Sequence, residues 1–426
     1  MEKTKTLLFL ILVCCSCSAG AVSFIKSIAY EGNDVTRGMV MDREIYIKPG
    51  DVFNEAEIEK SRQAIMDLGL FKTVHYYLEE NYDGTDSNST DAYIEVVFVV
   101  KEKYYFYVLP KIKLDDNEVF YGAQLTWDNA WGLNHSVKAR YENRGSTAGV
   151  DESKNSFKYN YPNVNNSAYN LDFRLQSSNR VDEADPENLV DRQDETFQIS
   201  VSRWLNKRGR NRGWFVGGSA LYQQRLNEVI TGNQLSENVE ATVLGVNAGY
   251  RNLKEYVYNR GGKAFSYSLD WSDESVGSGS EFVRYQLAYR SYYRLDDSPY
   301  KNLNVQTQFG HSNNKILGQY AFSLGSRTDL RGYENNRFNG NVMLLVNVEY
   351  MFPHPRHPTV RYVYFADIGN TYENSSEVFH EPLNVGAGVG MRWKVRSLVN
   401  IDLRVDLGYG FTDDDYRFSF GTRHAF

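Results

Sequence analysis

From about residue 103 onward, the sequence alternates apolar and polar residues in one segment after another. Residues 400–411 carry apolar or aromatic side chains at odd positions and charged or small ones at even positions, and residues 263–271 and 169–176 show the same alternation. Successive side chains of a strand point to opposite faces, so each segment predicts a strand with one apolar and one polar face. Strands of a soluble sandwich are usually about five or six residues long. These segments run to about nine to twelve residues, which is the length a tilted strand needs to cross a bilayer.

We count sixteen alternating segments. They start near residues 103, 117, 133, 153, 167, 194, 212, 237, 261, 280, 300, 340, 358, 382, 399 and 415. An even number of antiparallel strands closes into a barrel without free edges. The connectors support this count, because long outward ones at 178–194, 226–237 and 311–340 contrast with short inward ones such as 131–132. The chain is therefore expected to be mainly β, with a 16-stranded antiparallel transmembrane β-barrel at 103–426 and the sixth outward loop at about 311–340.

Composition favours a strand-rich protein over a helical enzyme. Aromatic residues make up 14% of the chain, with 32 Tyr and 23 Phe, while Pro numbers only 9 and the mean hydropathy is −0.53. The formal net charge of −7 argues against a nucleic-acid binder. The sequence contains no G-x-S-x-G, phosphate-loop or H-E-x-x-H pattern, so we expect no enzyme, no cofactor and no metal site.

The first 21 residues read as a signal peptide. A basic start, a short apolar run at 6–13 and small residues at Ala19 and Ala21 predict cleavage after Ala21. The alternative is a lipoprotein signal acylated at Cys14 or Cys17. All three cysteines lie in this segment, so the mature chain would have neither a disulfide framework nor a thiolate metal site. No later run of 18 apolar residues predicts a transmembrane helix.

Residues 22–102 have a different pattern, that of a small α+β domain. Residues 24–30, 74–78 and 93–100 predict strands, and residues 54–68 predict a helix. Asn54 would cap that helix, with Glu57 three residues later as in a capping box. The order of elements, together with "YEGND", "IKPGDVFNEAEIEKSRQAIMDLGLF" and "VVFVVKEK", resembles a POTRA (polypeptide-transport-associated) domain.

One POTRA-like domain followed by a sixteen-stranded barrel resembles the BamA-type outer-membrane protein assembly and translocation superfamily, also called the bacterial surface antigen family. The likeness covers essentially the whole mature chain. Its most specific motif is Leu330-Arg331-Gly332-Tyr333 in the sixth outward loop, which is similar to the (V/L)-R-G-(F/Y) signature of that family. The motif breaks the alternation of its surroundings, and Gly332 would permit a tight bend beside Arg331. We interpret the loop as a hairpin folded into the barrel rather than as wall.

Two carboxylates are candidate partners of Arg331, whose planar guanidinium suits bidentate pairing. Asp367 lies in Phe365-Ala-Asp-Ile-Gly369, which matches an F-x-D-x-G strand motif of the family, and Glu349 matches an acidic residue on the preceding strand. The resemblance implies that Asp367 and Glu349 clamp Arg331 and lock the loop inside. Phe365 has the same parity as Asp367, so either simple alternation fails there or the phenyl ring also lies in the lumen.

The resemblance also implies a lateral seam between the first and last strands that opens sideways, so few hydrogen bonds are expected there. The seam residues we expect are Tyr104, Tyr105, Tyr107, Gly421 and Phe426. Gly421 would loosen the last strand, and the terminal Phe426 with its alternating aromatics is similar to a barrel-recognition signal. An ordinary closing strand is the plainer interpretation, and both can hold together.

By resemblance, the protein inserts β-barrel proteins into the outer membrane or translocates polypeptide across it. With one POTRA domain it is expected to be an accessory or divergent member; the alternative is a passive outer-membrane pore or small-molecule channel. Expected partners are unfolded outer-membrane or exported polypeptides, outer-membrane lipids, and periplasmic proteins or lipoproteins that bind the POTRA domain, but no nucleic acid. The expected location is the outer membrane of a Gram-negative bacterium, with the POTRA domain in the periplasm. The basic inward turn at 207–212 would either touch anionic headgroups or be a solvated turn.

Overall fold

A computed structural model describes residues 23–81, 92–115, 118–147, 149–182, 189–206, 210–232, 238–296, 298–313, 321–378, 380–399 and 401–422. The predicted signal peptide and Phe426 lie outside these residues. Within them, none of the helices has the length and apolar character to cross a bilayer.

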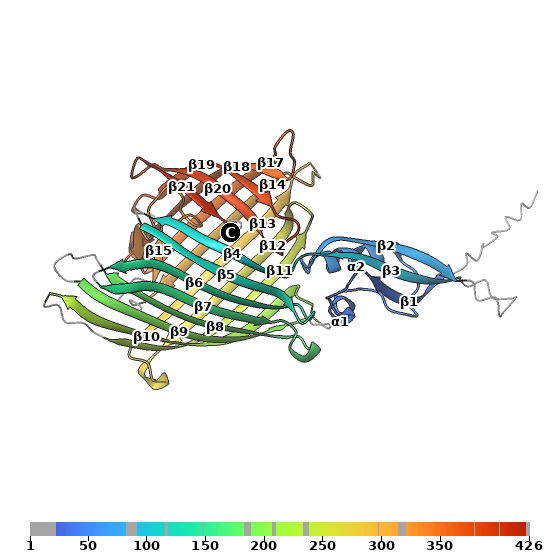
Figure 1. Cartoon of the computed structure of the whole chain (residues 1–426), viewed down its shortest axis with the longest axis horizontal. Helices are drawn as coiled ribbons and strands as arrows, with labels where there is room; N and C mark the ends of the chain where they lie inside the picture. Colours follow the sequence, from blue (N-terminus) through green and yellow to red (C-terminus); the bar gives the residue numbers. More distant parts are fainter. Residues whose placement is uncertain are drawn as a thin grey trace, which may run out of the picture.

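The larger part of the chain is one antiparallel sheet of sixteen strands that curls into a barrel (Figure 1). The strands follow one another in chain order from one edge of the sheet to the other. They are β4 (Phe106–Asp115), β5 (Glu118–Ala130), β6 (His135–Thr147), β7 (Val150–Tyr161), β8 (Tyr169–Asp182), β9 (Leu189–Trp204), β10 (Gly213–Thr231), β11 (Val239–Glu255), β12 (Arg260–Ser272), β13 (Phe282–Arg294), β14 (Asn302–Ser312), β17 (Val342–Pro353), β18 (Val360–Tyr372), β19 (Asn384–Lys394), β20 (Asp402–Gly410) and β21 (Asp415–Gly421). The predicted fold class and strand number are confirmed.

The predicted strand length is too short for part of the wall. β10 has 19 residues and stays paired with β9 from Phe215–Trp204 to Thr231–Leu189. The hairpin therefore continues the sheet beyond the span of about nine to eleven residues that crosses a bilayer. The alternation itself holds: on β9, Phe197, Ile199 and Val201 are all exposed on one face, as expected for a lipid-facing surface.

The two edge strands of the sheet, β4 and β21, face each other (Figure 1). β4 is hydrogen-bonded to β5 and β21 to β20, but the described residues of β4 and β21 form no ladder with each other. A side-chain contact joins the two strand segments, in which Lys111 Nζ donates to Thr422 Oγ1 at 3.4 Å. The barrel thus carries a seam with two backbone edges.

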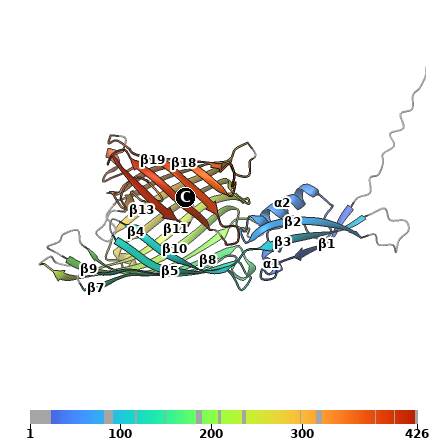
Figure 2. The ribbon, with the colours of Figure 1, turned by 45° about the horizontal axis from the view of Figure 1, so that its top comes forward.

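The smaller part is an α+β domain at one end of the barrel, drawn in blue in Figures 1 and 2. It comprises β1 (Ser23–Glu31), α1 (Gly38–Asp42), α2 (Glu55–Met66), β2 (Phe71–Asn81) and β3 (Ala92–Glu102). β3 lies in the middle of a three-stranded sheet, parallel to β1 and antiparallel to β2. The domain has its own apolar core, in which Ile58, Ile65, Phe71 and Phe98 are fully buried.

The start of α2 corrects one prediction. Asn54 caps the helix, but its side chain accepts from Ala56 N at 3.0 Å, and no reciprocal bond from Glu57 completes a capping box. Glu57 instead lies 3.5 Å from Lys60 on the exposed helix face. The single cap satisfies one of the free N–H groups of the first turn.

The small domain packs against the turns at the near end of the barrel. Arg37 N donates to Gly132 O at 3.0 Å, and Asn129 Nδ2 donates to Thr36 Oγ1 at 2.8 Å. A Cβ on Gly132 would come within 2.1 Å of the carbonyl oxygen of Val35. The turn can approach the domain this closely only because Gly132 has no side chain.

Arg210 and Arg212 of the basic turn belong to the same interface, so for these two residues both predictions are wrong; residues 207–209 lie outside the described part of the chain. Arg210 Nη2 donates to Ile45 O at 2.6 Å, and its guanidinium lies 3.8 Å from the centre of the Tyr46 ring. Arg212 forms an ion pair with Asp67 at the end of α2. These side chains bind the small domain rather than headgroups or water.

A buried carboxyl group lies in this interface. Burial raises the pKa of Glu44 to about 7, although Arg43 and the arginines of the basic turn oppose the shift. The protonation state of this junction is therefore sensitive to pH near neutrality.

Candidate functional site

The chain between β14 and β17 does not continue the wall. It forms a small hairpin of β15 (Phe322–Leu324) and β16 (Phe338–Gly340), and the residues between them enter the barrel. Leu330, Arg331 and Tyr333 at its tip are at most 4% exposed. A loop of an ordinary barrel rim would be solvated, so this one is an internal element.

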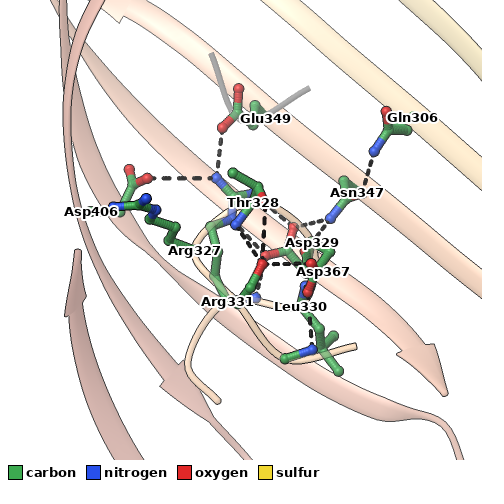
Figure 3. Close-up of polar contacts among 12 residues, drawn as sticks. Gln306, Arg327, Thr328, Asp329, Leu330, Arg331, Asn347, Glu349, Asp367 and Asp406 are labelled. Atoms are coloured by element: carbon green, nitrogen blue, oxygen red, sulfur yellow. Dashed lines mark hydrogen bonds and ion pairs between the residues drawn. The ribbon is translucent and has the colours of Figure 1, made fainter. Parts of the chain in front are cut away.

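Arg331 is held by the two predicted carboxylates, as Figure 3 shows. Its Nε and Nη2 donate to the two oxygens of Asp367 on β18 at 2.6 and 2.7 Å, and its backbone N donates to Asp367 Oδ2 at 3.1 Å. Nη1 donates to Glu349 Oε1 on β17 at 2.6 Å. The guanidinium thus makes a bidentate pair and a second charge-assisted bond, all with buried partners.

The parity question at Phe365 has a clear answer. β17 and β18 pair in continuous register from Val342–Tyr372 to Pro353–Arg361, so alternation does not fail at this point. The Phe365 ring is 5% exposed and lies inside, 3.7 Å from Arg331 Cζ. The ring therefore covers the guanidinium and adds a desolvated cation–π contact.

The ionic network extends beyond the predicted clamp of Arg331, Asp367 and Glu349. Arg392 on β19 donates to Glu349 at 2.7 Å and to Asp406 on β20 at 2.5 Å. Arg404 Nε lies 3.2 Å from Asp406 Oδ2. Arg404 and Asp406 were noted only as members of the polar face of residues 400–411. Charged residues at lumen-facing positions of consecutive strands were the available signal, but strand register was needed to pair them.

Asn347 also joins the site without having been predicted. Its Nδ2 donates to Asp367 Oδ1 at 2.7 Å and to the Asp329 backbone O at 2.6 Å, while Gln306 Nε2 donates to its Oδ1 at 3.1 Å (Figure 3). It connects three strands to the loop backbone and fixes the orientation of Asp367.

Gly332 lets the loop lie directly on the barrel wall. Its φ is +97°, in the region that favours glycine, and an added Cβ would come within 2.6 Å of Gly410 N. Gly408 of β20 lies beside Gly332 of the loop, and a Cβ on Gly386 of β19 would come within 2.0 Å of Arg331 O. We call Gly386, Gly408 and Gly410 the glycine track.

Tyr333 completes the predicted motif. Its hydroxyl donates to Val385 O at 2.6 Å and accepts from Thr412 N at 3.2 Å. It thus ties the loop to β19 and to the connection after β20.

The loop also reaches the last strand. Arg327 Nη1 donates to Phe420 O on β21 at 3.2 Å, and Arg327 O accepts from Arg404 Nη2 at 2.5 Å. Gly421, a predicted seam residue, pairs with Arg404 in the β20–β21 ladder. The loop and the end of the barrel wall are therefore in direct contact.

The predicted seam tyrosines lie in two different places. Tyr104 is 65% exposed and its backbone N donates to Ser397 O at 2.7 Å, so it lies at the inward turn between β19 and β20. Tyr107 OH donates to Val399 O at 3.0 Å in the same region. Tyr105 is not at the seam: it is buried in the core of the small domain, where its hydroxyl donates to Leu70 O at 3.2 Å. Residues 103–105 lie before β4 starts, so the wall alternation predicted there does not apply.

The arrangement anchors a loop to the barrel wall. Arg331 and its carboxylates are paired with one another and enclosed, and the described residues contain no group of three or more His, Cys, Asp or Glu side chains placed to hold a metal ion. What this geometry does is fix the loop hairpin against β17–β20.

Comparisons with known proteins agree with this architecture. Residues 121–426 match the family model described as the Omp85 superfamily domain, and residues 23–103 match the POTRA model described as surface antigen variable number repeat. A search of curated protein sequences returns no match.

Two solved structures with similar folds illustrate the likeness. CdiB from Acinetobacter baumannii is 14% identical, with a TM-score of 0.59 over 94% of this chain and 73% of that one. BamA from Haemophilus ducreyi lacking POTRA domains 1–3 is 15% identical, with a TM-score of 0.53 over 93% of this chain and 83% of that one. At these identities the likeness concerns the fold.

Proposed function

The chain belongs to the Omp85 superfamily, and from that membership we propose that it inserts β-barrel proteins into the outer membrane of a Gram-negative bacterium or translocates polypeptide across it. We place the POTRA domain in the periplasm, and we regard the protein as an accessory or divergent member that acts on unfolded outer-membrane or exported polypeptides.

The observation that carries this proposal is the seam. β4 and β21 present backbone edges without a ladder between their described residues, and an unpaired edge is a template for another strand. A client strand would pair with β4 by β-augmentation. Burial of its apolar face in the bilayer would supply the driving force, so no nucleotide is required.

The loop supports the proposal from the inside. Arg331 holds it against β17–β20, opposite the β4 edge, and Arg327 contacts β21. A wall that is braced on the β21 side can keep its shape while the β4 side accepts a strand. In the POTRA domain β1 and β2 are the outer strands of the sheet. The start of β1 is already hydrogen-bonded to residues 50–53, so the edge of β2 is the one that could receive an incoming segment in the same way.

A reversible cross-link of the seam tests the proposal. The chain has no cysteine beyond Cys17, so K111C/T422C introduces a unique pair on the two sides of the seam. Lys111 Nζ reaches Thr422 Oγ1 at 3.4 Å only over the length of the lysine side chain, so oxidation is carried out with a short alkanedithiol that bridges the two cysteines through two disulfides. We expect the oxidised variant in proteoliposomes to lose insertion of a urea-unfolded barrel client, and reduction to restore it. K111C and T422C alone are the controls and should insert at the unmodified rate.

Two results would contradict the proposal. One is full insertion by the oxidised double variant, which would show that the seam does not need to open. The other is robust solute flux in planar bilayers without client insertion by the unmodified chain, which would favour the passive pore.

A further inference from the structure

A cavity of about 640 Å³ lies inside the barrel beside the seam. The lumen-facing side chains of β4 and β6–β8 form one side, and Arg327, Arg404 and the end of β21 form the other. Lys111 and Thr422, which meet across the seam, both line it. The cavity therefore lies directly behind the line where the two edge strands face each other.

The lining is strongly basic. Among the described residues it contains seven cationic side chains and two carboxylates. The cations are Lys111, Lys138, Arg140, Lys158, Arg174, Arg327 and Arg404, and the carboxylates are Glu142 and Asp172. Lys138, Arg140 and Arg404 pair with Asp128, Glu142 and Asp406, respectively, and cations still outnumber carboxylates when these partners are counted. The whole chain carries a formal charge of −7, so this excess of positive charge is local. Low-dielectric walls concentrate such a field on whatever enters.

Arg404 gives a second, independent indication of an anionic ligand. It lines the cavity and is 2% exposed, and its Nη1 has no hydrogen-bond partner in the described part of the chain. A buried donor without an acceptor costs free energy. A small shift of the guanidinium toward the cavity would bring Nη1 to an anionic oxygen of a ligand, which would supply that acceptor.

The position of the cavity within the barrel gives the depth at which the ligand would bind. Lys138 is in the first half of β6, Lys158 in the last half of β7, and Arg174 in the first half of β8. Those strand ends meet the turns on the side of the POTRA domain. These three cations therefore lie in the half of the barrel wall that is nearer to the POTRA domain.

The outer surface of the seam is apolar. On β21, Tyr416 and Phe418 are exposed, and on β4, Phe106 and Val108 are exposed. A polycationic cavity behind a gap with apolar flanks matches a molecule with a polyanionic head and apolar chains. A free anion would not use these flanks, and an acidic polypeptide would not need them.

We propose that this cavity binds the phosphate-bearing headgroup of an anionic phospholipid, which enters through the seam while its acyl chains remain on the apolar outer surface of β4 and β21. This site requires the barrel to lie in a membrane, but it does not depend on the insertion activity. Lipid in the seam would occupy the space that an incoming strand must cross.

Native mass spectrometry of the full chain in neutral detergent tests the site. The probes are dioleoylphosphatidylglycerol and dioleoylglycerol, which share their acyl chains but differ in the phosphate. We expect retention of the phosphatidylglycerol alone, at least tenfold weaker in K158Q/R174Q and weakened by added salt. Lys158 and Arg174 are both exposed to the lumen, so their replacement should not disturb the fold.

R290Q is the matched control, because Arg290 is an exposed lumen-side arginine on β13 that does not line the cavity. It should bind like the unmodified chain. R174Q alone, expected to bind about threefold more weakly, provides the same comparison if the double variant does not fold.

Three results would overturn the proposal. Equal retention of the two lipids would show that the phosphate is not recognised, and unchanged binding by K158Q/R174Q would place the lipid elsewhere. Binding of inorganic phosphate or of polyglutamate in a K158Q/R174Q-sensitive manner, without retention of phosphatidylglycerol, would assign the cavity to a free anion or to a polypeptide.

Discussion

Removing the guanidinium of Arg331 should release the internal loop. Arg331 is 2% exposed and makes three side-chain hydrogen bonds to Asp367 and Glu349, besides its contact with Phe365. Breaking a buried ion pair by deleting one partner costs about 3–5 kcal/mol, because the remaining charge stays buried and uncompensated. Arg392 still pairs with Glu349, so the buried charge that loses its ionic partner in R331M is the Asp367 carboxylate. R331M should therefore raise the undocked population of the loop by a factor of about 10² to 10⁴.

Cysteine accessibility measures that population. Thr328 is exposed to the cavity inside the barrel while the loop is docked. T328C is therefore probed with a maleimide carried on a polymer too large to enter the lumen, which reacts only when the loop leaves it. We expect fast labelling in R331M and slow labelling in the parent. R331K should be intermediate, because lysine keeps the charge but cannot reproduce the bidentate pair.

R337M is the matched control. Arg337 belongs to the same loop and pairs with Asp413 at 3.0 Å, but its side chain is 47% exposed. Exposed pairs contribute about 0–1 kcal/mol, so labelling should hardly change. If R331M labels no faster than R337M, the buried network does not hold the loop and our reasoning is refuted.

Three further predictions follow from backbone geometry, burial and charge. Gly332→Ala should undock the loop, because its Cβ would meet the β20 backbone. Gly277→Ala is the control: its φ is +76° and nothing lies within 4 Å of the Cβ, so it should cost only the conformational strain of about 1–2 kcal/mol. Thiol labelling at residue 328 compares the two variants, and equal labelling rates would contradict the clash. Burial raises the pKa of the Glu44 carboxyl from 4.5 to about 7. Between these pH values the folded protein holds a proton that the unfolded chain does not, so the free energy of unfolding of the POTRA domain should fall by up to about 3 kcal/mol as the pH rises through this window. Pulse proteolysis in urea at pH 5 and pH 8 should show this dependence in the parent and lose it in E44Q; an unchanged dependence would exclude Glu44 as its source. R212Q should weaken docking of the POTRA domain on the barrel by about 1–3 kcal/mol, because it removes the cation that pairs with the mostly buried Asp67 carboxylate. The distribution of spin-label distances between the two domains should broaden, and an unaltered distribution would show that the ion pair does not hold the domain.

The alternation of apolar and polar residues was sufficient to predict the barrel, because a strand in a membrane wall must satisfy lipid on one face and the lumen on the other. Each of the sixteen predicted strand starts lies within about five residues of an observed one. The pattern fails where a segment leaves the wall. Tyr105 has the parity of a wall residue, but it packs in the POTRA core, and nothing in the local sequence marks that change of environment.

The candidate site was predictable only as far as its motif extends. Arg331, Glu349 and Asp367 were found because a family signature points to them, and the structure brings them together. Arg392 and Asp406 were not found, because their pairing depends on the register of β19 with β20. A shift of one residue in the register would move every side chain of a strand to the other face of the sheet. The register depends on contacts between strands, so the pattern of a single sequence cannot specify it.

The interface turns show the same limit. A basic turn at 207–212 reads equally well as a solvated loop, a headgroup contact or a protein contact. The choice was decided by Ile45 O and Asp67, which are more than a hundred residues away in the chain. Charge predicts that a turn has a partner, but only the fold identifies the partner.

The glycine track has a mechanical consequence. Because Gly386, Gly408 and Gly410 present no Cβ to the loop backbone, the loop meets a smooth surface along β19 and β20. Resistance to its withdrawal therefore comes from the polar contacts of Arg331, Tyr333, Arg327 and the Asp329 carbonyl rather than from side chains of the glycine track. We therefore expect the loop to stay docked while these polar contacts persist. Once they break, it can leave the lumen without side-chain clashes against the glycine track.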